Sequence, residues 1–184
     1  MIKLLLKLTF SLIIKIVYLG YQEAGLNALF LLLPSKLLIP VLVKYGAAIC
    51  DDVEMQSPVI FHNVDPKKTT HYKNLNIGSQ AYIGKEVFFD LADKIILEEK
   101  VTISMRVTLL THTHAGNSPL SSNKLVPDYA PIVLRKGCYI GAGAIILPGV
   151  TVGENSIIGA GSVVTRSIPP NSTAVGVPAR LITS

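Results

Sequence analysis

The chain has 184 residues, of which 49% are hydrophobic and 16% are charged. This length favours one domain, and so apolar a composition excludes a disordered protein. The net charge of +5 is uneven, since residues 1–50 carry +4 and the rest carry only +1. A nearly neutral body lacks a basic tract for nucleic acid, so we expect no nucleic-acid partner. Two cysteines, Cys50 and Cys138, are too few for a disulfide-built secreted scaffold and predict two buried thiols in a reducing compartment.

Residues 1–50 form an apolar, cationic leader. Its polar positions recur every four residues, at Lys3, Lys7, Ser11 and Lys15. This spacing predicts a helix with a narrow polar stripe, which is typical of a membrane interface, and no apolar run reaches the ~20 residues that a membrane span needs. We therefore expect a cytoplasmic protein that contacts the inner face of the cell membrane through residues 1–45. The alternatives are a leader that packs on its own domain or on a sister subunit, and a targeting segment.

A different pattern dominates residues 51–184, where an aliphatic or aromatic residue recurs at every sixth position. The first run is Ile77, Ile83, Phe89, Ile95, Val101 and Val107. After an interruption, the second run is Leu134, Ile140, Ile146, Val152, Ile158 and Val164. A period of six falls on a different side of an α-helix at each step, so the pattern excludes an amphipathic helix. It predicts an all-β fold in which three hexads make one triangular coil and successive coils stack.

Two further segments interrupt or end this repeat. Residues 113–133 contain three prolines together with glycine, serine and asparagine, which predicts an extended loop. A long loop inside a compact repeat is usually functional. The repeat ends at Pro169 and Pro170, because proline cannot donate a hydrogen bond to a further strand. We expect residues 169–184 to cap the open end.

Short motifs between residues 74 and 182 match a known family. They are NLNIG (74–78), LTHTH (110–114), YIGA (139–142), ILPGVTVG (146–153), IGAGSVVT (158–165) and GVPAR (176–180). Together they resemble the hexapeptide-repeat acyltransferases, in the branch of the galactoside, maltose and colanic acid O-acetyltransferases. The resemblance implies a left-handed parallel β-helix, a homotrimer with active sites between neighbouring subunits, and acetyl-CoA as the acyl donor. The leader, with its Leu33-Pro34-Ser35 segment, resembles that of bacterial surface-polysaccharide acetyltransferases.

Transfer of an acetyl group from a thioester to a sugar hydroxyl needs a base at that hydroxyl and donors for the oxyanion that forms. His114 lies where the repeat gives way to the loop and matches the family's catalytic histidine, so the resemblance implies that it is the base. His112, two residues earlier, would face a similar side of an extended strand and is the alternative base or a substrate contact. Asp90 and Asp93 lie in the region of the family's acceptor-binding polar residues, and either one can bind the acceptor or orient His114.

The resemblance also implies an acyl-donor site. Its residues would be Ala142, Ala160, Gly161, Thr165, Arg166 and Arg180. The backbone N–H of Ala142 would face the thioester oxygen, the small residues would hold the pantetheine arm through their backbone, and the two arginines would meet the CoA phosphates. Tyr139 stands where the family often has tryptophan and would line the acceptor pocket.

The predicted activity is O-acetylation of a sugar hydroxyl by direct attack on acetyl-CoA, in surface-polysaccharide or glycan-precursor synthesis and without a metal. An N-acetyltransferase acting on an amino sugar would share the fold and the acyl donor. A zinc-dependent hydratase, similar to the γ-type carbonic anhydrases, would need His62 or His71 of another subunit as a third ligand beside His112 and His114. A non-catalytic trimeric scaffold is the remaining alternative.

Overall fold

The computed structural model describes residues 2–64, 72–114, 116 and 128–182; within the first helix it describes the side chains from residue 12 onward, except those of residues 18, 22 and 23. The described part contains two N-terminal helices, α1 (Ile2–Leu32) and α2 (Ser35–Lys44), followed by short strands. The strands are β1 (Ala48–Ile49), β2 (Glu54–Met55), β3 (Val59–His62), β4 (Leu75–Ile77), β5 (Tyr82–Ile83), β6 (Val87–Asp90), β7 (Ile95–Leu97), β8 (Thr102–Ile103), β9 (Thr108–Leu109), β10 (His112–Thr113), β11 (Asp128–Tyr129), β12 (Ile132–Leu134), β13 (Tyr139–Ile140), β14 (Ile145–Ile146), β15 (Thr151–Val152), β16 (Ile157–Ile158), β17 (Val163–Val164), β18 (Thr173–Gly176) and β19 (Ala179–Ile182).

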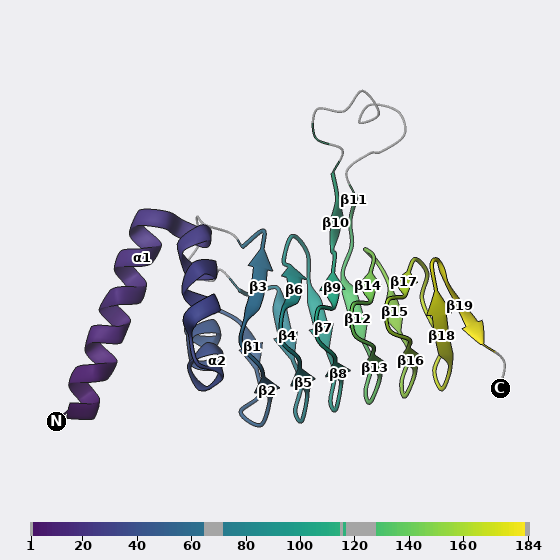
Figure 1. The fold of residues 1–184 in the computed structure, drawn as a ribbon, viewed down its shortest axis with the longest axis horizontal. Coiled ribbons are helices and arrows are strands. Elements are labelled where there is room, and N and C mark those ends of the chain that lie inside the picture. The colour runs from purple at the N-terminus through teal and green to yellow at the C-terminus, as the bar shows by residue number, and fades with distance from the viewer. Residues whose placement is uncertain (1, 65–71, 115, 117–127, 183–184) are drawn as a thin grey trace.

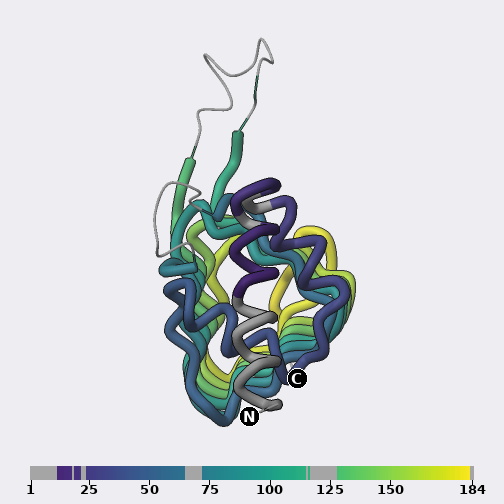
Figure 2. The backbone as a smooth tube through the Cα atoms, turned by 90° about the vertical axis from the view of Figure 1, so that its left-hand side faces the viewer, coloured from purple at the N-terminus to yellow at the C-terminus, as the bar shows by residue number. Residues whose placement is uncertain are grey.

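Three sheets of stacked, parallel strands form the sides of a prism (Figure 1). One side is β1-β4-β7-β12-β15, the second is β2-β5-β8-β13-β16-β18, and the third is β3-β6-β9-β14-β17. Each full coil therefore contributes one strand to each side, and the coils lie over one another when the stack is viewed from its end (Figure 2). The predicted left-handed parallel β-helix is confirmed.

The stacking register corrects one part of the predicted repeat. Ile77 lies beside Leu97, whereas Ile95 lies beside Leu75. After Phe89, the next residue at the equivalent inward position is Leu97, eight residues later instead of six. Two extra residues between β6 and β7 therefore shift the phase of the repeat. The prediction that the first run of equivalent positions continues through Ile95, Val101 and Val107 is therefore wrong. The observed continuation is Leu97, Ile103 and Leu109.

The β-helix also begins one coil earlier than the predicted hexads. Strands β1, β2 and β3 form this first coil, and they pair in parallel with β4, β5 and β6. Its inward positions repeat at the same step of six: Ile49, Met55 and Phe61. Residues 63–74 then interrupt the step, which is why the pattern was visible only from Ile77 onward.

Helices α1 and α2 cover the N-terminal end of the stack (Figures 1 and 2). The side chain of Asn27 on α1 accepts a hydrogen bond from the backbone N–H of Phe61 and donates one to its carbonyl, so it satisfies the outer edge of β3. Leu26, Phe30 and Leu33 are buried in the same core as the strands. Covering an edge strand in this way prevents it from pairing with another chain. The last third of α1 thus packs on its own domain, one of the alternatives for the leader.

Residues 12–19 of α1 present a different surface. Of their described side chains, the exposed large apolar ones are Leu12, Ile13, Ile16 and Leu19, whereas Ile14 is buried. Lys15 on the same helix and Lys36 and Lys44 on α2 are exposed as well. Within the described residues, neither helix combines the length and the apolar character needed to cross a membrane.

Two further features complete the fold. Strands β10 and β11 pair antiparallel and project from the body as a ribbon at the predicted loop, between β9 and β12 (Figure 1). Residues 117–127 of that loop lie outside the described residues. At the other end, β18 and β19 form an antiparallel hairpin that covers the last coil.

Candidate active site

A pocket of about 440 Å³ lies at the base of the projecting ribbon. Its lining residues are Asn63, Ala92, His112, His114 and Tyr129. They come from the ends of β3 and β6 and from both strands of the ribbon, so segments far apart in the sequence meet here. The pocket contains both histidines of the LTHTH motif, as the motif suggested.

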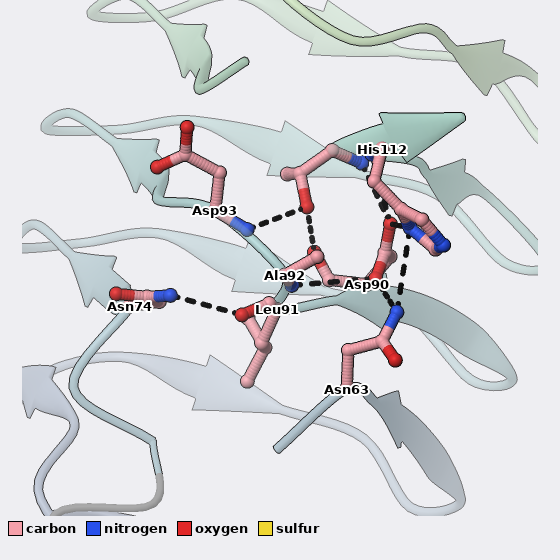
Figure 3. A network of polar contacts seen from close by, with 8 residues as sticks. Asn63, Asn74, Asp90, Leu91, Ala92, Asp93 and His112 are labelled. Carbon is pink, nitrogen blue, oxygen red and sulfur yellow. Dashed lines mark hydrogen bonds and ion pairs between the residues drawn. The ribbon is translucent and has the colours of Figure 1, made fainter. Parts of the chain in front are cut away.

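Asp90, at the end of β6, is fully buried beneath this pocket and anchors a network of hydrogen bonds (Figure 3). Its Oδ2 lies 2.5 Å from Nδ1 of His112 and accepts the backbone N–H groups of Thr111 (2.9 Å) and His112 (3.1 Å). Its Oδ1 accepts the side-chain amide of Asn63 (2.7 Å) and the backbone N–H of Ala92 (3.3 Å). Both oxygens of the carboxylate are thus used within the protein.

The protonation of Asp90 follows from these contacts. Burial by itself would raise the pKa of Asp90, but the hydrogen bonds from His112, Asn63 and Thr111 outweigh it and hold the pKa below its ordinary value. Asp90 is therefore a carboxylate at neutral pH. A buried carboxylate that contacts a half-buried imidazole fixes the orientation of that ring.

The two histidines are held differently. The side chain of His112 is 22% exposed, and its ring stacks on Tyr129 with a centroid distance of 5.9 Å and an interplanar angle of 20°. His114 is exposed, and its Nδ1 accepts the backbone N–H of Gly116 at 2.9 Å. His112 is thus fixed by groups from two other strands, whereas the Nδ1 partner of His114 is only two residues away.

The structure separates the two candidate carboxylates. The side chain of Asp93 points away from Asp90 and His112 (Figure 3), and its Oδ1 accepts the backbone N–H of Lys94 at 2.6 Å. The backbone N–H of Asp93 donates to the hydroxyl of Thr111 at 2.9 Å. Asp90 is therefore the carboxylate that meets an imidazole, and Asp93 supports the neighbouring turn.

Three of the predicted acyl-donor residues, Ala142, Ala160 and Gly161, lie on another edge of the prism. Ala142 follows β13 and Ala160 follows β16, so they occupy the same corner of successive coils, where the N–H of Gly161 donates to the carbonyl of Ala142 at 2.8 Å. In the described part of the chain, the backbone N–H groups of Ala142 and Ala160 donate to no backbone carbonyl. Donors of this kind suit a thioester oxygen or the amides of a pantetheine arm.

The remaining predicted residues do not line the histidine pocket either, although Thr165 and Arg166 follow β17 on the same edge of the prism. Tyr139 is 42% exposed on β13, beside Thr102 and Ile157. Thr165 and Arg166 are exposed just after β17, and Arg180 is exposed on β19. None of the four lines the histidine pocket in the described structure.

Sequence reasoning missed several residues of the pocket. Asn63, Ala92 and Tyr129 carry no motif that marks them. One signal was available for Ala92, because the two extra residues that shift the hexad phase lie between β6 and β7, next to Asp90. A break in the regular repeat therefore lies beside the site.

Neither the zinc alternative nor a cysteine nucleophile finds support in the described residues. No group of three or more histidine, cysteine, aspartate or glutamate side chains gathers there as a metal site would require, and His71 lies outside the described residues. Burial raises the pKa of the Cys138 thiol to about 12, so it stays protonated. The expectation of two buried thiols is wrong for Cys50, which is exposed because it lies between the end of β1 and the turn at residues 51–52.

Comparison with known proteins agrees with this architecture. The family "Bacterial transferase hexapeptide (six repeats)" matches residues 131–166. Galactoside O-acetyltransferase of Escherichia coli strain K12 is 33% identical over 136 residues, which are 74% of this chain and 63% of that protein. A Schizosaccharomyces pombe protein named "Putative acetyltransferase C18B11.09c" is 36% identical over 143 residues, which are 77% of this chain and 68% of that one. The chain thus spans less than two thirds of the galactoside enzyme.

Solved structures show the same fold along most of the chain. A maltose O-acetyltransferase from Clostridium difficile 630 has a TM-score of 0.72 at 26% identity, over 88% of this chain and 83% of that chain. A galactoside acetyltransferase in complex with coenzyme A has a TM-score of 0.71 at 28% identity, over 88% of this chain and 78% of that chain. With its stacked hexads, its shared fold and its 36% identity to a relative of which it covers 68%, the chain belongs to the hexapeptide-repeat acetyltransferase family.

Proposed function

We propose that the chain is an O-acetyltransferase that moves an acetyl group from acetyl-CoA to a sugar hydroxyl, with an imidazole of the histidine pocket as the general base. The observation that carries this proposal is the pocket itself, where two histidines and a buried carboxylate meet beside the loop. The galactoside and maltose enzymes that share the fold support a sugar as the acceptor. The motif match favours His114 as the base, and His112 is the alternative.

The chemistry needs few groups. The imidazole takes the proton of the sugar hydroxyl while the hydroxyl oxygen bonds to the acetyl carbon. Backbone N–H groups such as that of Ala142 stabilise the oxyanion that forms. The carbon–sulfur bond then breaks, and the leaving CoA sulfur takes the proton back from the imidazolium. The products are the acetylated sugar and free CoA thiol, so the reaction balances without a metal and without an acetylated form of the enzyme.

A homotrimer with active sites between neighbouring subunits completes this proposal. The histidine pocket lies where the third side of the prism passes to the first, whereas Ala142 and Ala160 lie where the second side passes to the third. A single chain therefore presents two half-sites on different edges. A neighbouring copy, related by a three-fold axis, would bring one edge against the other.

Release of CoA thiol from acetyl-CoA over a panel of bacterial sugars tests the activity. We expect at least one sugar to support turnover and the double variant His112→Ala/His114→Ala to lose about 100-fold or more of it. The product should be an ester that mild base cleaves, whereas an amide would mark an N-acetyltransferase. Equal turnover in the wild type and the double variant would show that the histidines do not act, and no turnover with any sugar would favour a non-catalytic scaffold.

We further propose that the exposed apolar side chains of residues 12–19 of α1 contact the inner face of an anionic membrane, which would bring a lipid-linked or polymeric glycan precursor near the enzyme. Exposed apolar residues and exposed lysines on the helical leader support this placement. Deletion of residues 1–45 is a poor test, because Phe30 and its neighbours belong to the core.

Vesicle flotation of the full chain is the appropriate measurement. We expect binding to vesicles that contain phosphatidylglycerol and little binding to pure phosphatidylcholine. The triple variant Leu12→Ser/Ile16→Ser/Leu19→Ser should lose most of the bound fraction, since it removes exposed apolar area. The control Val177→Ser changes an exposed apolar residue at the opposite end and should bind as the wild type does. Equal binding by the triple variant would contradict the proposed membrane contact.

A further inference from the structure

The Nδ1 atoms of the two pocket histidines have partners of opposite character. A carboxylate can only accept a hydrogen bond, and Nδ1 of His112 faces Oδ2 of Asp90 at 2.5 Å. A backbone N–H can only donate one, and Nδ1 of His114 faces the N–H of Gly116 at 2.9 Å. In the neutral imidazoles, the proton of His112 therefore sits on Nδ1 and the proton of His114 sits on Nε2.

These tautomers leave the two Nε2 atoms with different chemistry. Nε2 of His112 keeps its lone pair and can take a proton from a hydroxyl group. Nε2 of His114 carries a hydrogen and can only donate a hydrogen bond until it loses that proton. The tautomer of a catalytic histidine is set by the partner of its other nitrogen, so the Nδ1 contacts decide which ring can act as the base.

The surroundings of His112 strengthen this distinction. Asp90 is fully buried and charged, and it is held in place by Asn63 and by two backbone N–H groups of the 111–112 segment. The side-chain nitrogen Nδ2 of Asn63 and Nδ1 of His112 each contact the carboxylate of Asp90. These two nitrogens therefore lie close together, 3.3 Å apart. Tyr129 stacks on the imidazole and limits its rotation. When His112 gains a proton, the buried carboxylate is in place to stabilise the imidazolium.

We propose that His112 is the general base of the acetyl transfer, that Asp90 is its positioning residue, and that His114 acts as a hydrogen-bond donor to the substrate through Nε2–H. This inference rests on the proposed O-acetyltransferase function, and it assigns a different role to each of the two histidines of the pocket. Nε2 of His112 takes the proton of the attacking hydroxyl, the oxygen–carbon bond forms, and the carbon–sulfur bond breaks. The proton then passes from His112 to the sulfur of CoA.

Conservative variants of the full-length protein separate the two roles in the thiol-release assay. A glutamine amide can donate a hydrogen bond from near the position of Nε2 but cannot take a proton. We therefore expect His112→Gln to lower kcat by about 100-fold or more, and His114→Gln to lower it by less than about 10-fold. His114→Ala, which also removes the donor, should be slower than His114→Gln. The reverse order, with His114→Gln the more damaging, would overturn the assignment and leave the proposed function standing.

Asp90→Asn tests the positioning role. The amide can donate to Nδ1, which would favour the tautomer with the proton on Nε2, so we expect kcat to fall by about 100-fold or more with little change in the KM for acetyl-CoA. Asp51→Asn, an exposed carboxylate in the turn before β2, is the matched control and should keep wild-type kinetics. Loss of folding is monitored by circular dichroism. A folded Asp90→Asn protein with an unchanged kcat would overturn the role of Asp90.

A measurement that needs no acceptor keeps this inference separate from the proposed function. Long-range ¹H–¹⁵N correlation spectra of ¹⁵N-histidine-labelled protein report which ring nitrogen carries the proton. We expect the Nδ1–H tautomer for His112 and the Nε2–H tautomer for His114, with signals assigned from the two glutamine variants. In Asp90→Asn, the His112 signal should change tautomer. The Nε2–H tautomer at His112 in the wild type would overturn the proposal even if acetyl transfer to a sugar were observed.

Discussion

Replacing Phe61 with alanine is expected to lower the free energy of unfolding by about 3–5 kcal/mol. Phe61 is fully buried in the first coil and contacts three aromatic rings that come from three different segments. Its centroid lies 5.6 Å from Phe30 on α1, 5.2 Å from Tyr72, and 5.4 Å from Phe89 on β6. Alanine would leave a cavity where the helices meet the β-helix, and the rigid coils cannot collapse to fill it.

Urea unfolding at one fixed protein concentration measures this change, because the stability of an oligomer depends on concentration. The matched control is Ile60→Ala on the same strand, since Ile60 points outward and is 36% exposed. We expect this control to cost less than about 1.5 kcal/mol. If both variants lost the same stability, the aromatic cluster would not be the junction that joins the leader to the repeat.

Replacing Gly141 with alanine is expected to lower the free energy of unfolding by about 3 kcal/mol or more, because the coils are too close for an added methyl group. A Cβ at this position would lie 2.5 Å from the backbone nitrogen of Ala160 and 2.7 Å from the carbonyl oxygen of Ile158. Both atoms belong to the main chain of the next coil and cannot rotate away. The hydrogen bond from Gly141 N–H to the Ile158 carbonyl, 2.8 Å long, would have to lengthen.

Gly143→Ala is the control that separates crowding from backbone conformation. Gly143 has a φ of +69°, but a Cβ there would meet nothing within 4 Å. We therefore expect its cost to be limited to the left-handed conformation, about 1–2 kcal/mol. Thermal and urea unfolding of both variants compare the two effects. A Gly141→Ala protein as stable as Gly143→Ala would mean that the coils can separate more easily than their packing indicates.

The repeat was predictable because stacking requires the same residue type at the same position of every coil. From Leu134 onward the hexads agree with the observed register without a correction. The prediction failed where the chain departs from the period, at the two extra residues before β7 and at the missed first coil. Such departures change no composition and no motif, so only the pairing of strands reveals them.

The site was predictable in part. The LTHTH motif marked both histidines, and the region of Asp90 and Asp93 was recognised. The sequence did not distinguish Asp90 from Asp93 as the carboxylate of the site. The distinction depends on which side chain points toward residues 111–112 of the next coil. Asn63 and Tyr129 were not foreseen, since they reach the pocket through neighbours that lie far away in the sequence.

The amino-acid sequence by itself determined the coiled architecture, because a short period repeated over many coils admits one way to bury its aliphatic side chains. The resemblance to the family came from the short motifs, which the period alone does not specify. Only the tertiary structure decided which nitrogen of each imidazole carries the proton in the neutral ring. That choice depends on a buried carboxylate beneath one ring and a backbone N–H beside the other, and both are positioned by the path of the chain around the pocket. Local sequence specifies neither contact, because hydrogen-bond geometry is set by the packing of the surrounding coils.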